Sequence, residues 1–244
     1  MLKKLIGYSA VLFLALLATD IAMSFVYPGV SALKKENPQK TAFMEYREKQ
    51  WAKEGIHKAV IQKWVPLKRI SPYLIKAVII AEDDKFWGHE GFDFVAMQQA
   101  LEKDIKKRQF KAGGSTISQQ LAKNLYLSSE KSLIRKLREY FLAVRLEEEL
   151  PKNRIFHLYL NVIEFGPGIF GVEAAARHYF GKSVGQLNLE EIVRLTAVIP
   201  KPLVESPTRN SRWLKWRAGW LLSTLRKTGH ISSDQYQQFI GRFK

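Results

Sequence analysis

The stretch Ala81-Glu82-Asp83-Asp84-Lys85-Phe86-Trp87-Gly88-His89-Glu90-Gly91 decides how this chain is interpreted. It follows an apolar run, residues 74–80, that is typical of a buried helix, and Ser71-Pro72 supplies an N-cap and first-turn pair before that run. Glu82 is therefore expected at the C-terminal end of the helix. The negative end of the helix dipole and an apolar environment both raise a carboxyl pKa, so the sequence predicts a general base that works near neutral pH.

A plainer interpretation of the same residues is an acidic helix end that pairs with Lys85 or His89. Most exposed charges are only solvated, so on this stretch alone the plainer interpretation is preferred. The rest of the chain supplies the pattern that favours a base.

Composition limits the classes of partner. The chain has 244 residues, a formal charge of +16 and no cysteine. This length suffices for one domain, or for one domain with an additional lobe. The absence of cysteine excludes a disulfide framework and a thiolate metal site. So large a positive charge indicates an anionic partner, which could be a nucleic acid, acidic lipid headgroups or a phosphorylated substrate.

The N-terminus distinguishes among these partners. Lys3 and Lys4 precede a mostly apolar run, residues 5–27, which would be about 34 Å long as a helix and so could span a bilayer. The two lysines keep the N-terminus cytoplasmic under the positive-inside rule. A cleavable signal peptide is the alternative, but no small-x-small cleavage site follows the run, and Asp20 stands where its first small residue would be needed. We predict an uncleaved transmembrane anchor.

The predicted organisation is an anchor at residues 1–27, a stalk at 28–58 and one domain at 59–244. With the N-terminus in the cytoplasm, a single crossing puts this domain on the outer, periplasmic face of the cytoplasmic (inner) membrane.

Helical periodicity dominates the domain. The clearest helix is predicted over residues 132–150, with one apolar face beside a charged face, and Pro151 ends it. A late helix carries Trp213, Trp216, Trp220, Leu221 and Leu225 in a stripe that is typical of a core face. Further helices are predicted at residues 152–161, 172–180 and 188–198, with a short one after 232. The sequence therefore predicts an all-α, mainly helical fold.

A second helix start combines glycines with polar side chains. Gly113-Gly114-Ser115-Thr116 precedes Gln119, and Thr116 with Gln119 fits a capping box. Free N–H groups at this start, with Lys123 about two turns further on, are suited to receive a phosphate. An ordinary helix start with solvent-facing Gln and Lys side chains has an equal claim. A Walker loop is excluded because the lysine is too far from the glycines.

Five segments, in order, resemble the motifs of the peptidoglycan glycosyltransferases, the family that also forms the transglycosylase half of bifunctional penicillin-binding proteins. The segments are Glu82-Asp83 through Phe86, His89 and Gly91; Gly114-Ser115-Thr116 with Gln119-Gln120; Arg135-Lys136 with Glu139; Lys152 through Ile155 to Tyr159-Leu160-Asn161; and residues 197–202 with Ser206-Pro207.

This resemblance extends over residues 64–210, and the short chain with a Glu164-Phe165-Gly166 turn is similar to the monofunctional branch. Two positions depart from the family pattern. His157 stands where many relatives carry a glutamate, and we assign it no role. Lys131 stands where an arginine is frequent, so the charge is kept but the bidentate fork is lost.

The resemblance implies a lysozyme-like helical core with a smaller, membrane-facing jaw lobe at about residues 92–127. It also implies lipid II as the substrate, with the growing chain transferred from undecaprenyl pyrophosphate to the 4-hydroxyl of an incoming lipid II with inversion. The expected partners are lipid II, the growing glycan strand, membrane lipids and other cell-wall synthesis proteins.

The resemblance and the required chemistry together suggest roles. Glu82 would be the general base on the acceptor hydroxyl, and Lys123, Lys131 and Arg135 would hold the donor pyrophosphate. Glu139, the second catalytic candidate, is expected on the pyrophosphate side, where it acts through a divalent cation (Mg or Mn) or by ordering Arg135. No tightly bound cofactor and no dedicated metal site are expected. The other substrate-binding candidates are Asp83, Phe86, His89, Ser115, Thr116, Gln119, Gln120, Asn124 and Lys136, of which Ser115, Gln119 and Gln120 would orient the pyrophosphate.

Two other functions compete with this one. Lysozyme-like helical folds also host lytic glycan cleavage, but a lytic enzyme would need neither three cations around a phosphate nor a membrane anchor. A membrane-tethered nucleic-acid binder would use the +16 charge, but no helix-turn-helix spacing or stacking motif supports it, so no nucleic-acid partner is predicted. The basic segment at residues 106–111 is instead expected to meet lipid headgroups or the growing glycan.

Overall fold

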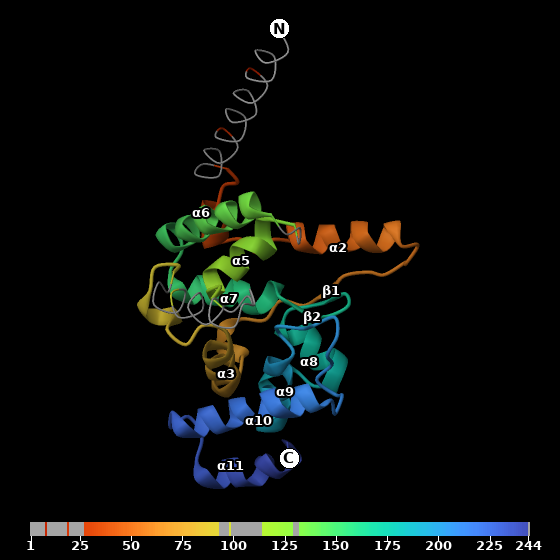
Figure 1. The fold of residues 1–244 in the computed structure, drawn as a ribbon, viewed down its shortest axis with the longest axis vertical. Coiled ribbons are helices and arrows are strands. Elements are labelled where there is room, and N and C mark those ends of the chain that lie inside the picture. Colours follow the sequence, from red (N-terminus) through yellow and green to blue (C-terminus); the bar gives the residue numbers. More distant parts are fainter. Residues whose placement is uncertain are drawn as a thin grey trace.

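The computed structural model describes residues 8, 19, 27–92, 98, 114–128 and 132–243. This part of the chain is built mainly from helices, as the sequence predicts (Figure 1). Among these residues, no helix combines the length and the apolar character that crossing a bilayer requires. Almost all of the predicted anchor and much of the proposed jaw lobe lie outside the described residues, as does Lys131.

The order of elements follows the caps and breaks in the sequence. The helices and strands are α2 (Ala42–Lys53), β1 (Ile61–Gln62), α3 (Pro72–Glu82), α5 (Ile117–Tyr126), α6 (Leu133–Glu149), α7 (Lys152–Val162), β2 (Glu164–Gly166), β3 (Ile169–Phe170), α8 (Val172–Phe180), α9 (Leu189–Ala197), α10 (Arg212–Lys227) and α11 (Ser233–Ile240). Short 3₁₀ turns occur at Ser31–Lys34, Leu67–Arg69, Phe86–Gly88, Val184–Gln186 and Gly241–Phe243. The helices predicted around residues 132–150, 152–161, 172–180 and 188–198 are therefore confirmed.

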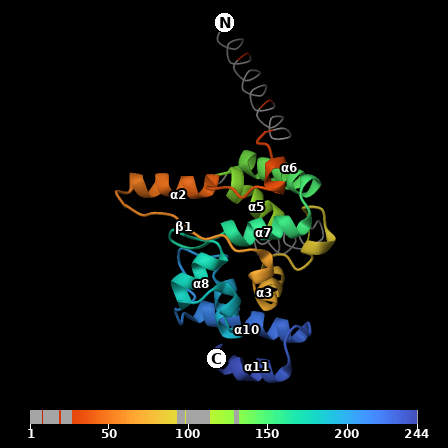
Figure 2. The same ribbon diagram turned by 180° about the vertical axis from the view of Figure 1, so that it is seen from behind.

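The helices are stacked around one apolar core. In Figure 1, α2, α5 and α6 lie towards the N-terminal end of the molecule, and α10 and α11 lie at the opposite end. Helix α5 packs on both α6 and α7, while α3 packs on α9 and α10. Seen from behind, α2 extends sideways from the other helices (Figure 2). The largest fully buried side chains include Tyr159, Phe86, Phe156, Phe165 and Phe170.

One small sheet joins distant parts of the chain. Its order is β1-β3-β2, with β1 parallel and β2 antiparallel to β3. The prediction of an all-α, mainly helical fold did not include these strands. These strands have only two or three residues, too few to show the alternation that marks a strand in a sequence.

The tryptophans of α10 do not all face the core. Trp216 is 63% exposed and Trp220 is 41% exposed, so the prediction of a core stripe is wrong for both. The prediction is confirmed at Leu221 and Leu225, which are buried, and the buried face of α10 is made of small and branched aliphatic side chains. Its members are Leu214, Ala218, Leu221, Leu222 and Leu225.

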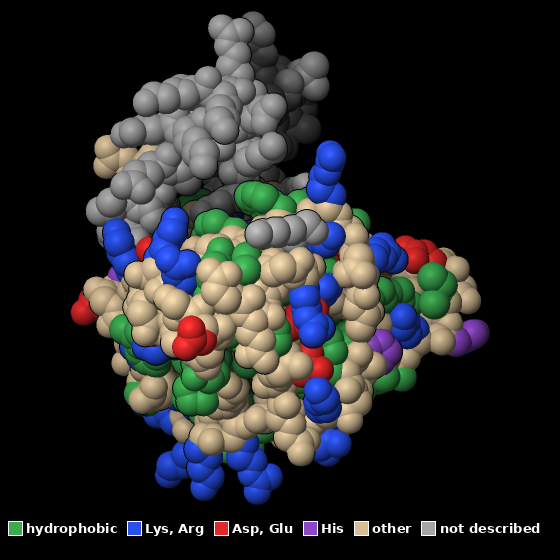
Figure 3. All heavy atoms as spheres, turned by 90° about the horizontal axis from the view of Figure 1, so that it is seen from below, with side chains coloured by type: hydrophobic (Ala, Val, Ile, Leu, Met, Phe, Trp, Pro, Cys, Tyr) green, Lys and Arg blue, Asp and Glu red, His purple; other side chains and the backbone are tan. Residues whose placement is uncertain are grey.

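The surface reflects the positive charge of the sequence. In the view from the α11 end, Lys and Arg side chains are spread over the exposed face and acidic side chains are sparser (Figure 3). Such a surface favours an anionic partner, as composition suggests.

Candidate active site

Glu82 is the last residue of α3, where the sequence predicts it. Its side chain is only 9% exposed. Gln120 Nε2, on α5, donates to one carboxylate oxygen at 3.0 Å, and Arg217 Nη2, on α10, lies 3.3 Å from the other. Burial raises the pKa of Glu82, and the contacts with Gln120 and Arg217 together with the charge of Lys123 offset part of that rise. The carboxyl keeps its proton to a higher pH than a solvated glutamate does, as suits a general base.

Two residues that support the Glu82 carboxyl, Tyr159 and Arg217, were not among the predicted catalytic or substrate-binding residues. The Tyr159 hydroxyl donates to Gln120 Oε1 at 3.1 Å, which turns the Gln120 amide nitrogen towards Glu82. Burial raises the pKa of Tyr159 well above its ordinary value, so the hydroxyl remains a donor.

Arg217 is the second of these residues, and its signal in the sequence is weak. The guanidinium lies 5.9 Å from the ring of Trp213 and 5.8 Å from that of Trp220. An arginine four residues after one tryptophan and three before the next shares their helix face, and this spacing is the only local sign of its position. Its contact with Glu82 joins residues 135 apart in sequence.

Lys123, also on α5, lies close enough to Glu82 for its charge to lower the Glu82 pKa. Within the described ranges, no side chain forms a hydrogen bond or an ion pair with its ammonium group. Burial lowers the pKa of Lys123, as do Arg135 and Lys136, whereas Glu139 and Glu164 raise it. An incompletely solvated cation without a hydrogen-bond or ion-pair partner is suited to bind an anion.

Glu139 is 3% exposed and binds two cations of its own helix. Arg135 Nη1 lies 2.6 Å from one oxygen, and the Lys136 ammonium contacts the other. Lys136 also donates to Ser115 Oγ at 2.8 Å, which connects α6 to the segment before α5. The structure thus shows Glu139 in contact with Arg135. In the part of the chain that the structure describes, no three His, Cys, Asp or Glu side chains are grouped to hold a metal ion.

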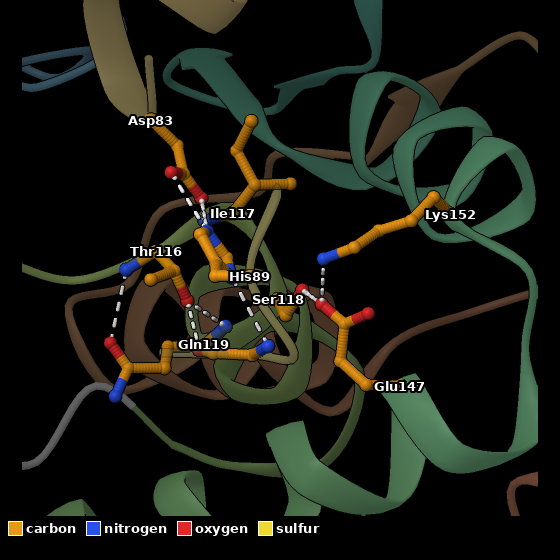
Figure 4. A network of polar contacts seen from close by, with 9 residues as sticks. Asp83, His89, Thr116, Ile117, Ser118, Gln119, Glu147 and Lys152 are labelled. Atoms are coloured by element: carbon orange, nitrogen blue, oxygen red, sulfur yellow. Dashed lines mark hydrogen bonds and ion pairs between the residues drawn. The ribbon is translucent and has the colours of Figure 1, made fainter. Parts of the chain in front are cut away.

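Asp83, the next carboxylate along the chain, belongs to a different network (Figure 4). It accepts the Ile117 N–H at 2.9 Å and His89 Nε2 at 3.0 Å. His89 Nδ1 accepts the Gly91 N–H at 3.1 Å, so the ring proton is on Nε2. A carboxylate on the first N–H of a helix satisfies a donor that would otherwise be unpaired. Asp83 therefore fixes the loop after α3 to the start of α5.

The predicted capping box is confirmed. Thr116 Oγ1 accepts the Gln119 N–H at 3.2 Å, and Gln119 Oε1 accepts the Thr116 N–H at 3.0 Å. Thr116 also donates to the Gly91 carbonyl at 2.7 Å. Gln119 is only 2% exposed, so its side chain is used for the cap.

A further ion pair supports the same helix. Ser118 Oγ and Lys152 Nζ both contact Glu147 Oε1, the latter at 2.7 Å, as Figure 4 shows. The Lys152 ammonium also lies 4.5 Å from the centre of the buried Phe86 ring. Phe86 is thus a packing residue beneath the loop.

The structure therefore separates the motif residues into two groups. One group surrounds Glu82 or the cations near it, and consists of Gln120, Lys123, Ser115, Arg135, Lys136 and Glu139. The other group holds the loop and the helix start in place, and consists of Asp83, Phe86, His89, Thr116 and Gln119. Asn124 belongs to neither group, because its Nδ2 donates to the Gln120 carbonyl within α5 at 2.8 Å.

Comparisons with known proteins agree with these motifs. A family model described as "Transglycosylase" matches residues 48–226. Three similar proteins are each named biosynthetic peptidoglycan transglycosylase. The one from Nitrosospira multiformis is 47% identical over 78% of this chain and 82% of its own length. The one from Methylobacillus flagellatus is 44% identical over 83% of this chain and 89% of its own length. The one from Laribacter hongkongensis is 42% identical over 88% of this chain and 92% of its own length. Because the family model and these relatives cover most of the sequence, the chain belongs to the transglycosylase family.

Proposed function

We propose that this transglycosylase polymerises peptidoglycan glycan strands from lipid II. It transfers the growing chain from undecaprenyl pyrophosphate to the 4-hydroxyl of an incoming lipid II, with inversion at the anomeric carbon. The observation that carries this proposal is the arrangement of a buried carboxyl with a raised pKa, Glu82, beside the Lys123 ammonium, which has no hydrogen-bond or ion-pair partner among the described residues.

Glu82 acts as the general base. As the acceptor oxygen attacks the anomeric carbon, its proton passes to the Glu82 carboxylate. The new carbon–oxygen bond forms while the bond to the pyrophosphate breaks, and the electron pair leaves with the pyrophosphate. Gln120 and Arg217 hold the carboxylate from two sides, so its orientation is set before the substrate arrives.

The cations receive the leaving group. Lys123, Lys131 and Arg135 stabilise the negative charge that develops on the pyrophosphate. Glu139 holds Arg135 through the 2.6 Å ion pair, and Lys136 links Ser115 to the same carboxylate. Both oxygens of Glu139 are already bound by cations, so these side chains are not arranged as a site for Mg or Mn.

We extend the proposal to the setting of the enzyme. A lipid-linked donor requires an active site near a bilayer surface. A lysozyme-like core with a membrane-facing jaw lobe at about residues 92–127 would meet this requirement. An anchor at residues 1–27 would hold the domain at the periplasmic face of the membrane. The +16 charge favours acidic headgroups. Leu133 and Leu137, 86% and 46% exposed near the start of α6, add apolar surface. Membrane lipids, the growing glycan and other cell-wall synthesis proteins are the proposed partners.

One assay tests the function directly. Labelled lipid II is incubated with the detergent-solubilised full chain, and the products are separated by size. The wild-type protein is expected to form glycan polymer, and Glu82→Gln is expected to form none while still binding a moenomycin-type donor mimic. Near-normal polymerisation by this variant would remove Glu82 from the base role. Release of soluble muropeptides from purified sacculi, without polymerisation, would favour a lytic enzyme instead.

A further inference from the structure

A second buried carboxylate lies close to Lys123. Glu164, in β2, has a side chain only 4% exposed. Arg47 of α2, whose side chain is 12% exposed, contacts both oxygens of this carboxylate. Its Nε lies 3.2 Å and 3.1 Å from the two oxygens, and its Nη2 lies 2.8 Å from the second. This fork is the geometry in which arginine binds carboxylate most strongly.

The ring of Phe43 brings the two cations together. The Arg47 guanidinium carbon lies 5.0 Å and Lys123 Nζ lies 5.5 Å from its centre. Helix α2 packs on α5, which carries Lys123, so the segment before the domain contributes directly to the surroundings of this lysine. Burial raises the pKa of Glu164, whereas Arg47, then Lys123, then Lys58 lower it. Lys123 is therefore the next cation available to Glu164 after Arg47.

Besides Glu82, Lys123 thus has two buried carboxylates near it, Glu139 and Glu164, and both are already occupied by arginine. Glu139 binds Arg135 and Lys136, and Glu164 binds Arg47. A buried carboxylate without a partner is costly, so each would capture a nearby ammonium if its own partner were lost. The lysine side chain is long and flexible enough to turn towards such a carboxylate.

We propose that Arg47 is a positioning residue that keeps Glu164 occupied, so that the Lys123 ammonium stays available to the pyrophosphate of the donor. This inference rests on the proposed function, in which Lys123 receives that pyrophosphate. Phe43 and Arg47 both precede residue 48, where the match to the family model begins, so the family match assigns them nothing.

The test compares the two partners of the ion pair. Binding of farnesyl pyrophosphate to the full chain in detergent is measured by calorimetry, with farnesol as the uncharged control ligand. Arg47→Met is expected to weaken binding about tenfold, because Glu164 then competes for Lys123. Glu164→Gln removes the competitor and is expected to bind as tightly as wild type or tighter. The double variant Arg47→Met/Glu164→Gln is expected to regain the wild-type affinity.

A merely structural ion pair predicts a different pattern. Loss of either partner would then weaken binding alike, and that result would overturn the proposal. The matched control is Glu48→Gln, which breaks the exposed pair between Glu48 of the same helix and Lys40 before it, and is expected to change nothing. If Arg47→Met does not fold, Arg47→Lys replaces it, because it loses the fork but keeps the charge. A smaller loss of affinity that Glu164→Gln reverses is then expected, and an unchanged affinity would overturn the proposal.

Failure of this inference can be separated from failure of the proposed function. A wild-type protein that polymerises lipid II while all variants bind farnesyl pyrophosphate alike would keep the function and remove the role of Arg47. A protein that shows the expected binding pattern but forms no glycan would keep the role of Arg47 at an anion site and remove polymerisation.

Discussion

Glu82 and Asp83 are adjacent in the sequence but belong to regions of different kinds. Asp83 binds a backbone N–H and a histidine ring at 2.9–3.0 Å, which fixes the start of α5. Glu82 has a longer 3.3 Å contact with Arg217 and a raised pKa, and it lies beside a lysine that has no hydrogen-bond or ion-pair partner among the described residues. Satisfied charges stabilise architecture, whereas incompletely satisfied charges retain the capacity to bind a ligand or take a proton.

The strongest test of this contrast is Glu82→Gln. We expect polymerisation of lipid II to fall by about 10²–10⁴-fold or below detection, because the amide cannot accept the proton. The free energy of unfolding is expected not to fall, because a buried carboxyl that loses its charge no longer needs solvation. Glycan formation and chemical denaturation measure the two effects. A large loss of stability would place Glu82 with Asp83 as an architectural residue.

Asp83→Ala is expected to give the opposite result. The variant leaves the Ile117 N–H and His89 without their acceptor, which costs about 1–3 kcal/mol of unfolding free energy for each buried group left unsatisfied. Denaturation with urea measures this loss, and activity is expected to fall with the folded fraction. A fully stable Asp83→Ala protein without activity would contradict the division and would place Asp83 in the chemistry.

Arg217→Met sharpens the contrast through pH. The arginine lowers the Glu82 pKa, so its removal is expected to raise that pKa further. The base must be deprotonated to act, so activity is lost as the pH falls through its pKa, and the acid limb should move to higher pH in the variant. Rate against pH measures the shift. Arg212→Met, at the exposed start of the same helix, is the control, and an acid limb that does not move would remove Arg217 from the site.

Lys123 gives a smaller effect on the alkaline side. Burial lowers the pKa of Lys123, so the ammonium loses its proton at a lower pH than a solvated lysine does. Pyrophosphate binding should therefore begin to decline at a lower pH. Lys123→Arg keeps its charge throughout this range and should remove the early decline. Affinity for farnesyl pyrophosphate against pH measures the difference, and identical profiles for the two proteins would contradict the assignment.

Local patterns account for what the sequence predicted correctly. The end of α3 at Glu82 and the Thr116–Gln119 cap both follow from residues a few positions apart. Contacts between distant residues have no such signature, so the pairing of Arg47 with Glu164, 117 positions away, could not be predicted. The short strands and the exposed Trp216 were missed because tertiary packing decides them. The roles of Lys131 and of residues 93–113 stay predictions.

The contact between Glu82 and Arg217 also has a consequence for biosynthesis. A polypeptide emerges from the ribosome N-terminus first, and its early segments fold before its last ones are made. Glu82 meets its arginine only when a residue 135 positions later has been synthesised and α10 has packed on α3. A nascent or prematurely terminated chain that lacks α10 therefore lacks one of the two side chains that hold the Glu82 carboxylate, so the proposed base is fully positioned only after α10 has folded.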